Sequence, residues 1–120
     1  MAEHNDLGTS GEKLAVAYLK EKGYEVLETN WRSGSVEIDI IAQNKQFLIV
    51  AEVKTRTSNK FGEPEEFVTK QKQKFLIRAA QAYITKMDLD VEVRFDIISV
   101  LVSGTSSKIS HIEDAFYPIL

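Results

Sequence analysis

Two neighbouring apolar segments, residues 36–42 and 46–55, restrict the fold more than any other part of the sequence. Apolar residues stand at consecutive positions within them, as at Ile40 and Ile41, so both faces of each segment are apolar. Strands of this kind are typical of the centre of a sheet, where both faces are covered. A short polar turn at residues 44–45 separates the segments, which predicts an antiparallel pair of central strands.

Hydrophobic periodicity predicts two helices. The first is expected from about Ser10 to Lys22, with Thr9 and Glu12 at capping-box spacing. The second is expected to begin after Thr69 as its N-cap. Its apolar positions form one stripe, which consists of Phe75, Leu76, Ala79, Ala80 and Tyr83.

Three further segments have strand character. Residues 24–31 precede the central pair, residues 90–102 form a long run rich in β-branched residues, and residues 108–116 are expected to form an edge strand. The predicted order of elements is α-β-β-β-α-β-β. A chain of 120 residues without internal repeats or linkers predicts a single α/β domain over residues 1–120.

Composition excludes several classes of protein. Apolar residues make up 43% and charged residues 28%, which is typical of a folded domain, and the net charge of −3 argues mildly against nonspecific coating of nucleic acid. The absence of cysteine excludes disulfides, thiolate catalysis and cysteine-ligated zinc. No apolar run approaches the roughly 18 residues of a membrane span, and no signal peptide is evident, so we expect a cytoplasmic location.

Four charged residues, Glu37, Asp39, Glu52 and Lys54, interrupt the two central strands. Because successive strand side chains point to opposite faces, all four are expected on one face. A two-residue turn would place Glu37 opposite Glu52 and Asp39 diagonally from Glu52, roughly 7 Å away at the backbone. Carboxylates this close repel one another unless a positive charge lies between them.

Mg²⁺ suits such a pair, because it takes oxygen ligands and is held by one or two carboxylates plus substrate phosphate. Asp39 and Glu52 would bind the ion, and Lys54 would orient water or offset charge in the transition state of phosphodiester hydrolysis. The alternative is that Glu37, Glu52 and Lys54 form ordinary ion pairs on a solvated face. Apolar residues on both faces of these strands favour the first interpretation.

Several blocks of sequence together resemble the YraN-like family of small bacterial proteins. These are GEKLAVAYLKEKGYEVLETNWR, EIDIIA, EVKTR, FGEPEEFVT followed by KQ, and AAQAYI, which span residues 11–84, and RFDII at residues 94–98. That family is grouped with the restriction-endonuclease-like fold, the PD-(D/E)xK superfamily that includes Holliday-junction resolvases. The resemblance implies a central mixed β-sheet flanked by helices, with a nuclease-type site on the meander.

The resemblance also implies roles for particular residues. The EID and EVK motifs assign catalysis to Asp39, Glu52 and Lys54, and the GE motif of the first helix adds Glu12. Glu37 matches the GEID block but lies outside the minimal triad. The implied ligands of Mg²⁺, or of Mn²⁺, are Asp39, Glu52, Glu12 and Glu37. One residue departs from the family pattern, since position 36 is valine where the family usually has glycine.

The second helix is basic in an acidic chain. Five basic residues and no acid lie between residues 67 and 86, and such a patch attracts a phosphate backbone. Thr69 and the neighbouring helix amides could hold one phosphate. The residues expected to bind nucleic acid are Lys72, Gln73, Thr69, Arg56 and Arg78. Lys70 and Lys74 are better explained as solubilising residues.

These patterns predict a nucleic-acid-binding protein, expected to act on DNA, including branched or junction DNA, as a metal-dependent endonuclease. The alternatives are a binding module without hydrolysis on the same scaffold, and a protein-interaction domain. A homodimer is implied only by analogy with resolvases. His4 and His111 match no metal spacing, and His111 is expected on the strand surface.

Overall fold

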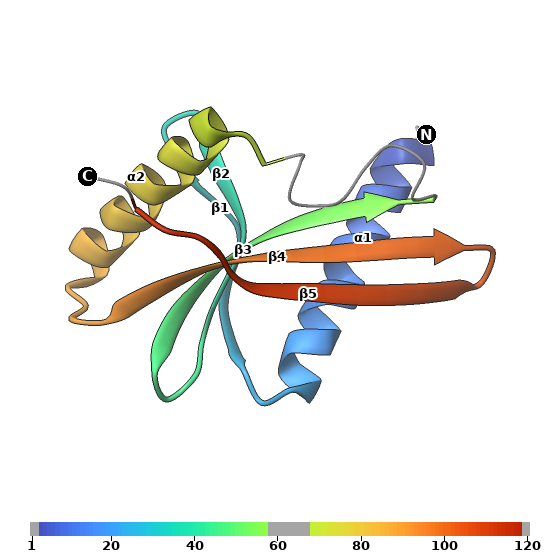
Figure 1. Ribbon diagram of the computed structural model, residues 1–120, viewed down its shortest axis with the longest axis horizontal. Coiled ribbons are helices and arrows are strands. Elements are labelled where there is room, and N and C mark those ends of the chain that lie inside the picture. Colours follow the sequence, from blue (N-terminus) through green and yellow to red (C-terminus); the bar gives the residue numbers. More distant parts are fainter. Residues whose placement is uncertain (1–2, 58–67, 119–120) are drawn as a thin grey trace.

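The computed structural model describes residues 3–57 and 68–118 (Figure 1). In these ranges the predicted order α-β-β-β-α-β-β and the α/β class are confirmed. The elements are α1 (Glu3–Glu21), β1 (Glu25–Ser33), β2 (Val36–Gln43), β3 (Phe47–Arg56), α2 (Lys70–Met87), β4 (Glu92–Ser103) and β5 (Ser106–Phe116). The sequence TSNKFGEPEE at residues 57–66 contains Gly62 and Pro64 and is expected to form a loop, and all of it except Thr57 lies outside the described residues.

The five strands form one mixed sheet in the order β1-β2-β3-β4-β5. Neighbouring strands are antiparallel except β3 and β4, which run parallel. A parallel pair needs a crossover connection, and α2 lies within that connection. β3 is therefore the central strand, with β2 on one side and β4 on the other.

The two helices cover opposite faces of the sheet, and each face has its own core. In Figure 1, α1 runs behind β3, β4 and β5, whereas α2 lies near β1 and β2. Ala15 and Leu19 of α1 pack with Ile40 and Ile49, while Leu76 of α2 packs into the other core. Coverage on both faces explains why β2 and β3 are apolar at odd and even positions.

Helix α1 approaches β3 closely at Gly11. A Cβ atom added to Gly11 would overlap the Oγ1 atom of Thr55 and lie 2.8 Å from its Cβ atom. Only glycine fits this contact without displacement of the helix or the strand. The contact fixes the adjacent Glu12 beside the end of β3.

The turn between β2 and β3 differs by two residues from the predicted one. The side-chain oxygen of Asn44 accepts hydrogen bonds from the backbone amides of Gln46, at 2.8 Å, and Phe47, at 2.7 Å. The strands therefore pair from Gln43 with Leu48 onward, not from a two-residue turn. A shift of two residues keeps every side chain on its predicted face.

The predicted start of the first helix is wrong, because α1 begins at Glu3. Thr9 consequently lies inside the helix and is not its N-cap. The N-cap of α2 is confirmed, since Thr69 Oγ1 accepts a hydrogen bond from the backbone amide of Lys72 at 3.2 Å. Neither helix, over the residues described, is long and apolar enough to cross a membrane.

Candidate active site

Two carboxyl side chains meet under α2 on the central strands. The last pair in the β2–β3 register is Ile40 with Ala51, so Asp39 and Glu52 are the next residues on each strand. Asp39 Oδ2 accepts a hydrogen bond from the backbone amide of Val53 at 2.8 Å. The structure therefore places Asp39 and Glu52 near each other, as the sequence predicted, one residue beyond the last pair of the register instead of in the predicted diagonal arrangement.

Glu52 is buried, with 5% of its side chain exposed. Its Oε1 atom is shielded from solvent and has no hydrogen-bond partner among the residues described. A buried carboxylate oxygen without a partner costs free energy. Such an atom next to a second carboxyl group indicates a place for a proton or a cation.

The pKa of Asp39 is raised from 3.8 to about 8. Burial is the largest cause, followed by the negative charge of Glu52, which also lies close enough to accept a hydrogen bond from Asp39 when Asp39 is protonated. The charge of Glu12 adds to the increase, and the amide of Val53 opposes it. Near neutral pH the pair therefore holds one proton in the absence of another positive charge.

Two lysines approach the pair from different elements. Lys72 Nζ of α2 lies 3.2 Å from Glu52 Oε2, and Lys54 Nζ of β3 lies 3.6 Å from the same atom. Both amines thus neutralise one oxygen of Glu52 and leave Oε1 without a partner. The sequence predicted Lys54 in the site, but it assigned Lys72 only to nucleic-acid binding.

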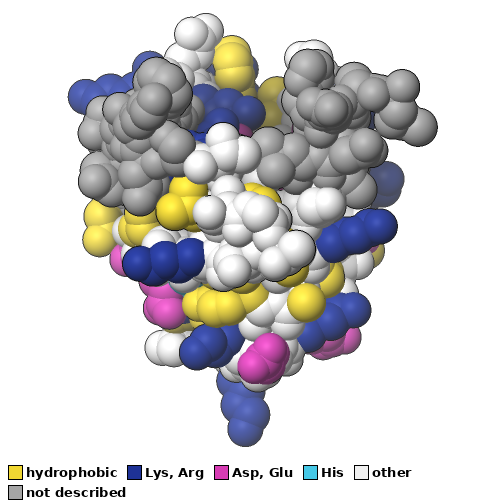
Figure 2. Space-filling model, turned by 90° about the vertical axis from the view of Figure 1, so that its right-hand side faces the viewer, with side chains coloured by type: hydrophobic (Ala, Val, Ile, Leu, Met, Phe, Trp, Pro, Cys, Tyr) yellow, Lys and Arg dark blue, Asp and Glu magenta, His cyan; other side chains and the backbone are white. Residues whose placement is uncertain are grey.

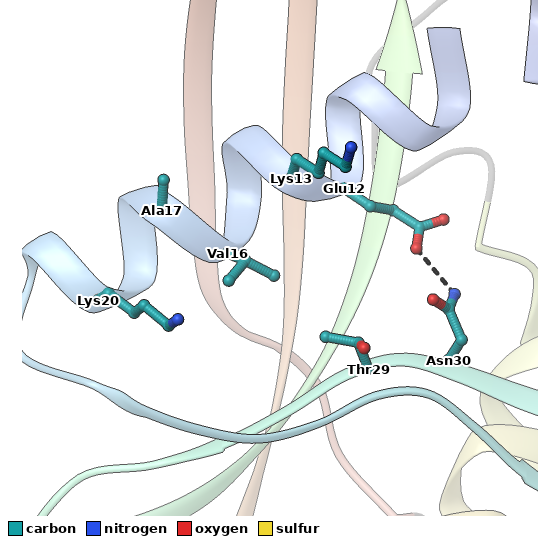
Figure 3. A pocket seen from close by; sticks show the side chains of 7 residues that line it. All are labelled: Glu12, Lys13, Val16, Ala17, Lys20, Thr29 and Asn30. Atoms are coloured by element: carbon teal, nitrogen blue, oxygen red, sulfur yellow. Dashed lines mark hydrogen bonds between the residues drawn. The ribbon is translucent and has the colours of Figure 1, made fainter. Parts of the chain in front are cut away.

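Glu12 lies beside the pair on the α1 side. Its Oε1 atom accepts a hydrogen bond from Asn30 Nδ2 at 2.7 Å (Figure 3). Asn30 has a φ of 51°, which asparagine tolerates better than most residues. Sequence reasoning missed Asn30, and its position in a strand gave no sign of this conformation. Glu12 and Asn30 also line a cavity of about 550 Å³ between α1 and β1.

Glu37 faces another partner. Its Oε1 atom lies 3.2 Å from Arg32 NH2, in an exposed ion pair. Within residues 3–57 and 68–118, no three Asp, Glu or His side chains are placed together to hold a metal ion. The structure thus brings Asp39 and Glu52 together, sets Glu12 next to them, and ties Glu37 to Arg32.

Asp39 and Glu52 fit a hard divalent cation of the Mg²⁺ type. Such ions need only one or two protein carboxylates, because water and substrate phosphate complete the coordination. The unpartnered Oε1 atom of Glu52 would supply one oxygen ligand, and the carboxyl of Asp39 would supply another once the cation displaces its proton. The roles of Glu12 and Glu37 as ligands stay predictions.

The residues predicted to bind nucleic acid divide into two groups. Three of them lie at the start of α2, where Gln73 Nε2 donates to the carbonyl oxygen of Val68 at 3.1 Å and Thr69 caps the helix. Arg78 lies further along α2 and is exposed, and Arg56 ends β3. In Figure 2, which faces the ends of β3 and β4, Lys and Arg side chains are visible near the upper edge.

A second polar cluster lies in the sheet away from the carboxyl pair. Asp96 accepts hydrogen bonds from Arg94 Nε at 3.0 Å and from the backbone amide of Asp114 at 3.1 Å, and it lies 2.7 Å from His111 Nε2. Burial alone would raise the pKa of Asp96, but these partners lower it below 3.8. The prediction of His111 on the surface is wrong, because its side chain is buried against Asp96 and Tyr18.

Comparison with known proteins shows similarity over nearly the whole chain. Residues 11–100 match the model of the uncharacterised protein family UPF0102. A UPF0102 protein of Flavobacterium psychrophilum is 53% identical, over 98% of each chain. UPF0102 proteins of Christiangramia forsetii and Bacteroides thetaiotaomicron are each 50% identical, over at least 98% of each chain.

Proposed function

Because this chain belongs to the UPF0102 family, the YraN family that its motifs resemble, its function has to be inferred from its own site, and we propose that it is a metal-dependent endonuclease acting on DNA. The buried pair of Asp39 and Glu52, with one oxygen left without a partner, is the observation that carries the proposal. If the two carboxyl groups served only the stability of the fold, we would expect each of their buried oxygens to accept a hydrogen bond from the protein.

Each residue of the site has a distinct role in the proposed reaction. Asp39 and Glu52 would hold Mg²⁺ or Mn²⁺, which when bound polarises a phosphate and lowers the pKa of a water. The amide of Val53 fixes the carboxyl of Asp39, and burial fixes that of Glu52. Lys54 lies near enough to Glu52 to move onto the scissile phosphate or its water.

Nucleic acid is the proposed substrate because the site lies under the basic helix. Residues 68–87 carry five basic side chains and no acid. Such a surface attracts the phosphates of nucleic acid whatever the base sequence is. Branched or junction DNA, a homodimer and a cytoplasmic location are parts of the proposal that rest on the resemblance to resolvases and on the sequence.

A binding module without hydrolysis is the second candidate, and the ion pair of Lys72 with Glu52 favours it. At 3.2 Å the amine satisfies one oxygen of Glu52 without any metal. If Lys72 stays paired with Glu52 when DNA binds, the carboxylate of Glu52 would anchor α2 to the sheet and would have no role in catalysis. The two candidates differ in whether metal binds to Asp39.

The test is a nuclease panel with single-stranded, duplex and four-way-junction DNA in Mg²⁺, Mn²⁺ or EDTA. We expect wild type to cleave at least one substrate in metal and none in EDTA, and Asp39→Asn and Glu52→Gln to be inactive. Lys74→Ala is the matched control, since Lys74 lies on the exposed side of α2 away from the site. Cleavage by Glu52→Gln at the wild-type rate would refute this site.

Metal binding gives an independent readout. A ligand present at about 100 times its Kd stabilises the folded state by about 2.7 kcal/mol. Mg²⁺ or Mn²⁺ should therefore raise the Tm of wild type and leave that of Asp39→Asn unchanged. Metal-insensitive unfolding of wild type, together with binding of DNA, would establish the second candidate.

A further inference from the structure

A groove leads from the candidate active site along α2. Two cavities of about 410 and 420 Å³ adjoin each other and share Ser35, Val36 and Phe75 in their walls. The first reaches Asp39, and the second reaches Arg78. The groove therefore runs between the β1–β2 turn and one face of α2.

The helical wall of this groove carries an aromatic ring between two cations. Lys72, Phe75 and Arg78 are spaced three residues apart, so they lie on one face of α2. Phe75 belongs to the apolar stripe that the sequence predicts, yet 37% of Phe75 is exposed. An apolar ring is thus presented in a groove that has a positive charge on each side.

The opposite wall is formed by residues 32–37 and Asp39. Beside Phe75 it consists of Val36 and the tight turn at residues 33–35, where Gly34 has a φ of 61°. These residues are small, so space is left over the ring of Phe75. Arg78 has no ion-pair partner among the described residues, whereas Arg32 is paired with Glu37. A free cation beside an exposed ring is suited to bind a phosphate next to a stacked base.

A base can stack on a side chain only where its own face is uncovered. In a duplex both faces of each base are covered by neighbouring pairs, whereas unpaired bases stack readily on Phe, Tyr or Trp. The two cationic side chains and the exposed ring of Phe75 together therefore favour binding of nucleic acid that has an unpaired segment. A protein partner would not need the cations at both ends of the groove.

We propose that this groove binds an unpaired strand, with one base on Phe75 and flanking phosphates on Arg78 and Lys72, so that the strand leads to Asp39. This assignment rests on the proposed function in one respect: the bound strand leads to Asp39 because Asp39 belongs to the proposed cleavage site. It assigns the substrate as single-stranded DNA or a duplex with an unpaired arm.

The test measures binding in EDTA, so that it does not depend on cleavage. The probes are a short fluorescein-labelled oligothymidylate and a blunt duplex of the same length, followed by fluorescence anisotropy. Loss of one stacking contact weakens binding roughly 5- to 150-fold, which is the expected change in Kd of the single strand for Phe75→Ala. Phe75→Trp should bind at least as well as wild type.

Matched variants separate stacking from general effects. Tyr117 is an aromatic residue that is 64% exposed and lies outside the groove, so Tyr117→Ala should bind like wild type. Arg78→Ala should reduce the slope of log K against log salt by about 0.7, the value for one phosphate on a single strand. Lys74→Ala should leave that slope unchanged. Wild-type Tm values for all variants would show that each is folded.

The outcomes distinguish this inference from the proposed hydrolysis. If Phe75→Ala binds the single strand as tightly as wild type, the groove is not a strand-binding site. If wild type prefers the blunt duplex, the unpaired strand is the wrong substrate. If binding depends on Phe75 but the protein cleaves no DNA, the groove is a strand-binding site and the proposed nuclease activity is refuted. If the protein cleaves DNA but neither binding nor cleavage depends on Phe75, the nuclease is supported and the groove is refuted.

Discussion

Replacement of Asp39 by asparagine should change how the stability of this protein depends on pH. The pKa of Asp39 is about 8 in the folded protein, against an ordinary value of 3.8. Between these values the folded state holds one proton that the unfolded state has released. Stability is then fully present below the lower value and is lost as pH rises toward the upper one.

The size of the effect follows from proton linkage. One proton corresponds to about 1.4 kcal/mol per pH unit, so a change from about pH 5.5 to about pH 7.5 should cost about 3 kcal/mol. Domains of this size have a total stability of only about 5–15 kcal/mol. Asp96 does not interfere, because its pKa is lowered below 3.8, outside this range.

Asparagine imitates the protonated form of Asp39. Its oxygen can still accept from the amide of Val53, and its amide can donate to Glu52. The Asp39→Asn variant should therefore exceed the stability of wild type by about 2 kcal/mol near pH 5.5 and by about 5 kcal/mol near pH 7.5, because wild type loses stability from pH 3.8 upward. Mg²⁺ at about 100 times its Kd should reduce that difference at the higher pH by about 2.7 kcal/mol, because it stabilises wild type alone.

The assay is urea unfolding at several pH values in EDTA, and the measured quantity is the difference between wild type and Asp39→Asn. This difference cancels the titration of groups that the two proteins share. Parallel stability curves across the range would refute the shared proton between Asp39 and Glu52. They would also remove the electrostatic basis for a cation at this site.

Three further variants test contacts described above. Lys72→Met should lower stability in EDTA by about 1–2 kcal/mol, because Glu52 loses its nearer cation, and Lys74→Met should not; equal effects in urea unfolding would contradict the ion pair. Gly11→Ala should destabilise by about 1–3 kcal/mol through overlap with Thr55, and an unchanged Tm would show that the contact relaxes freely. Asp96→Asn should cost about 3–5 kcal/mol, because the buried Arg94 would keep only the exposed Glu113, 3.4 Å away, as a counter-charge, and a smaller loss in urea unfolding would show that Glu113 or water replaces Asp96.

Element order and the shared face of the acids were predictable because both depend on local patterns. The two-residue period of a strand fixes which side chains share a face, so Asp39 and Glu52 were assigned together even with the wrong turn. The turn itself depended on the side chain of Asn44, which accepts from two amides and lengthens the loop. Composition alone does not reveal that choice between turn geometries.

Features that depend on long-range packing could not be predicted. Phe75 fits the apolar stripe of α2, but the helix is rotated so that this ring faces the β1–β2 turn and not the core. Lys72 reaches Glu52 of β3 only because α2 packs over the neighbouring strand β2. His111 gains its buried partners from α1 and β4, which are distant in sequence.

The acids and the amines of the site are attached in different ways. Asp39 and Glu52 project from strands that have hydrogen-bonded neighbours on both sides, and the backbone itself holds the carboxyl of Asp39. Lys54 and Lys72 end four-carbon stems, and 41% of the Lys72 side chain is in contact with solvent. When a proton or a cation enters or leaves the carboxyl pair, we therefore expect the two lysine side chains to change rotamer, on the timescale of side-chain rotation, while the backbone of the sheet keeps its position.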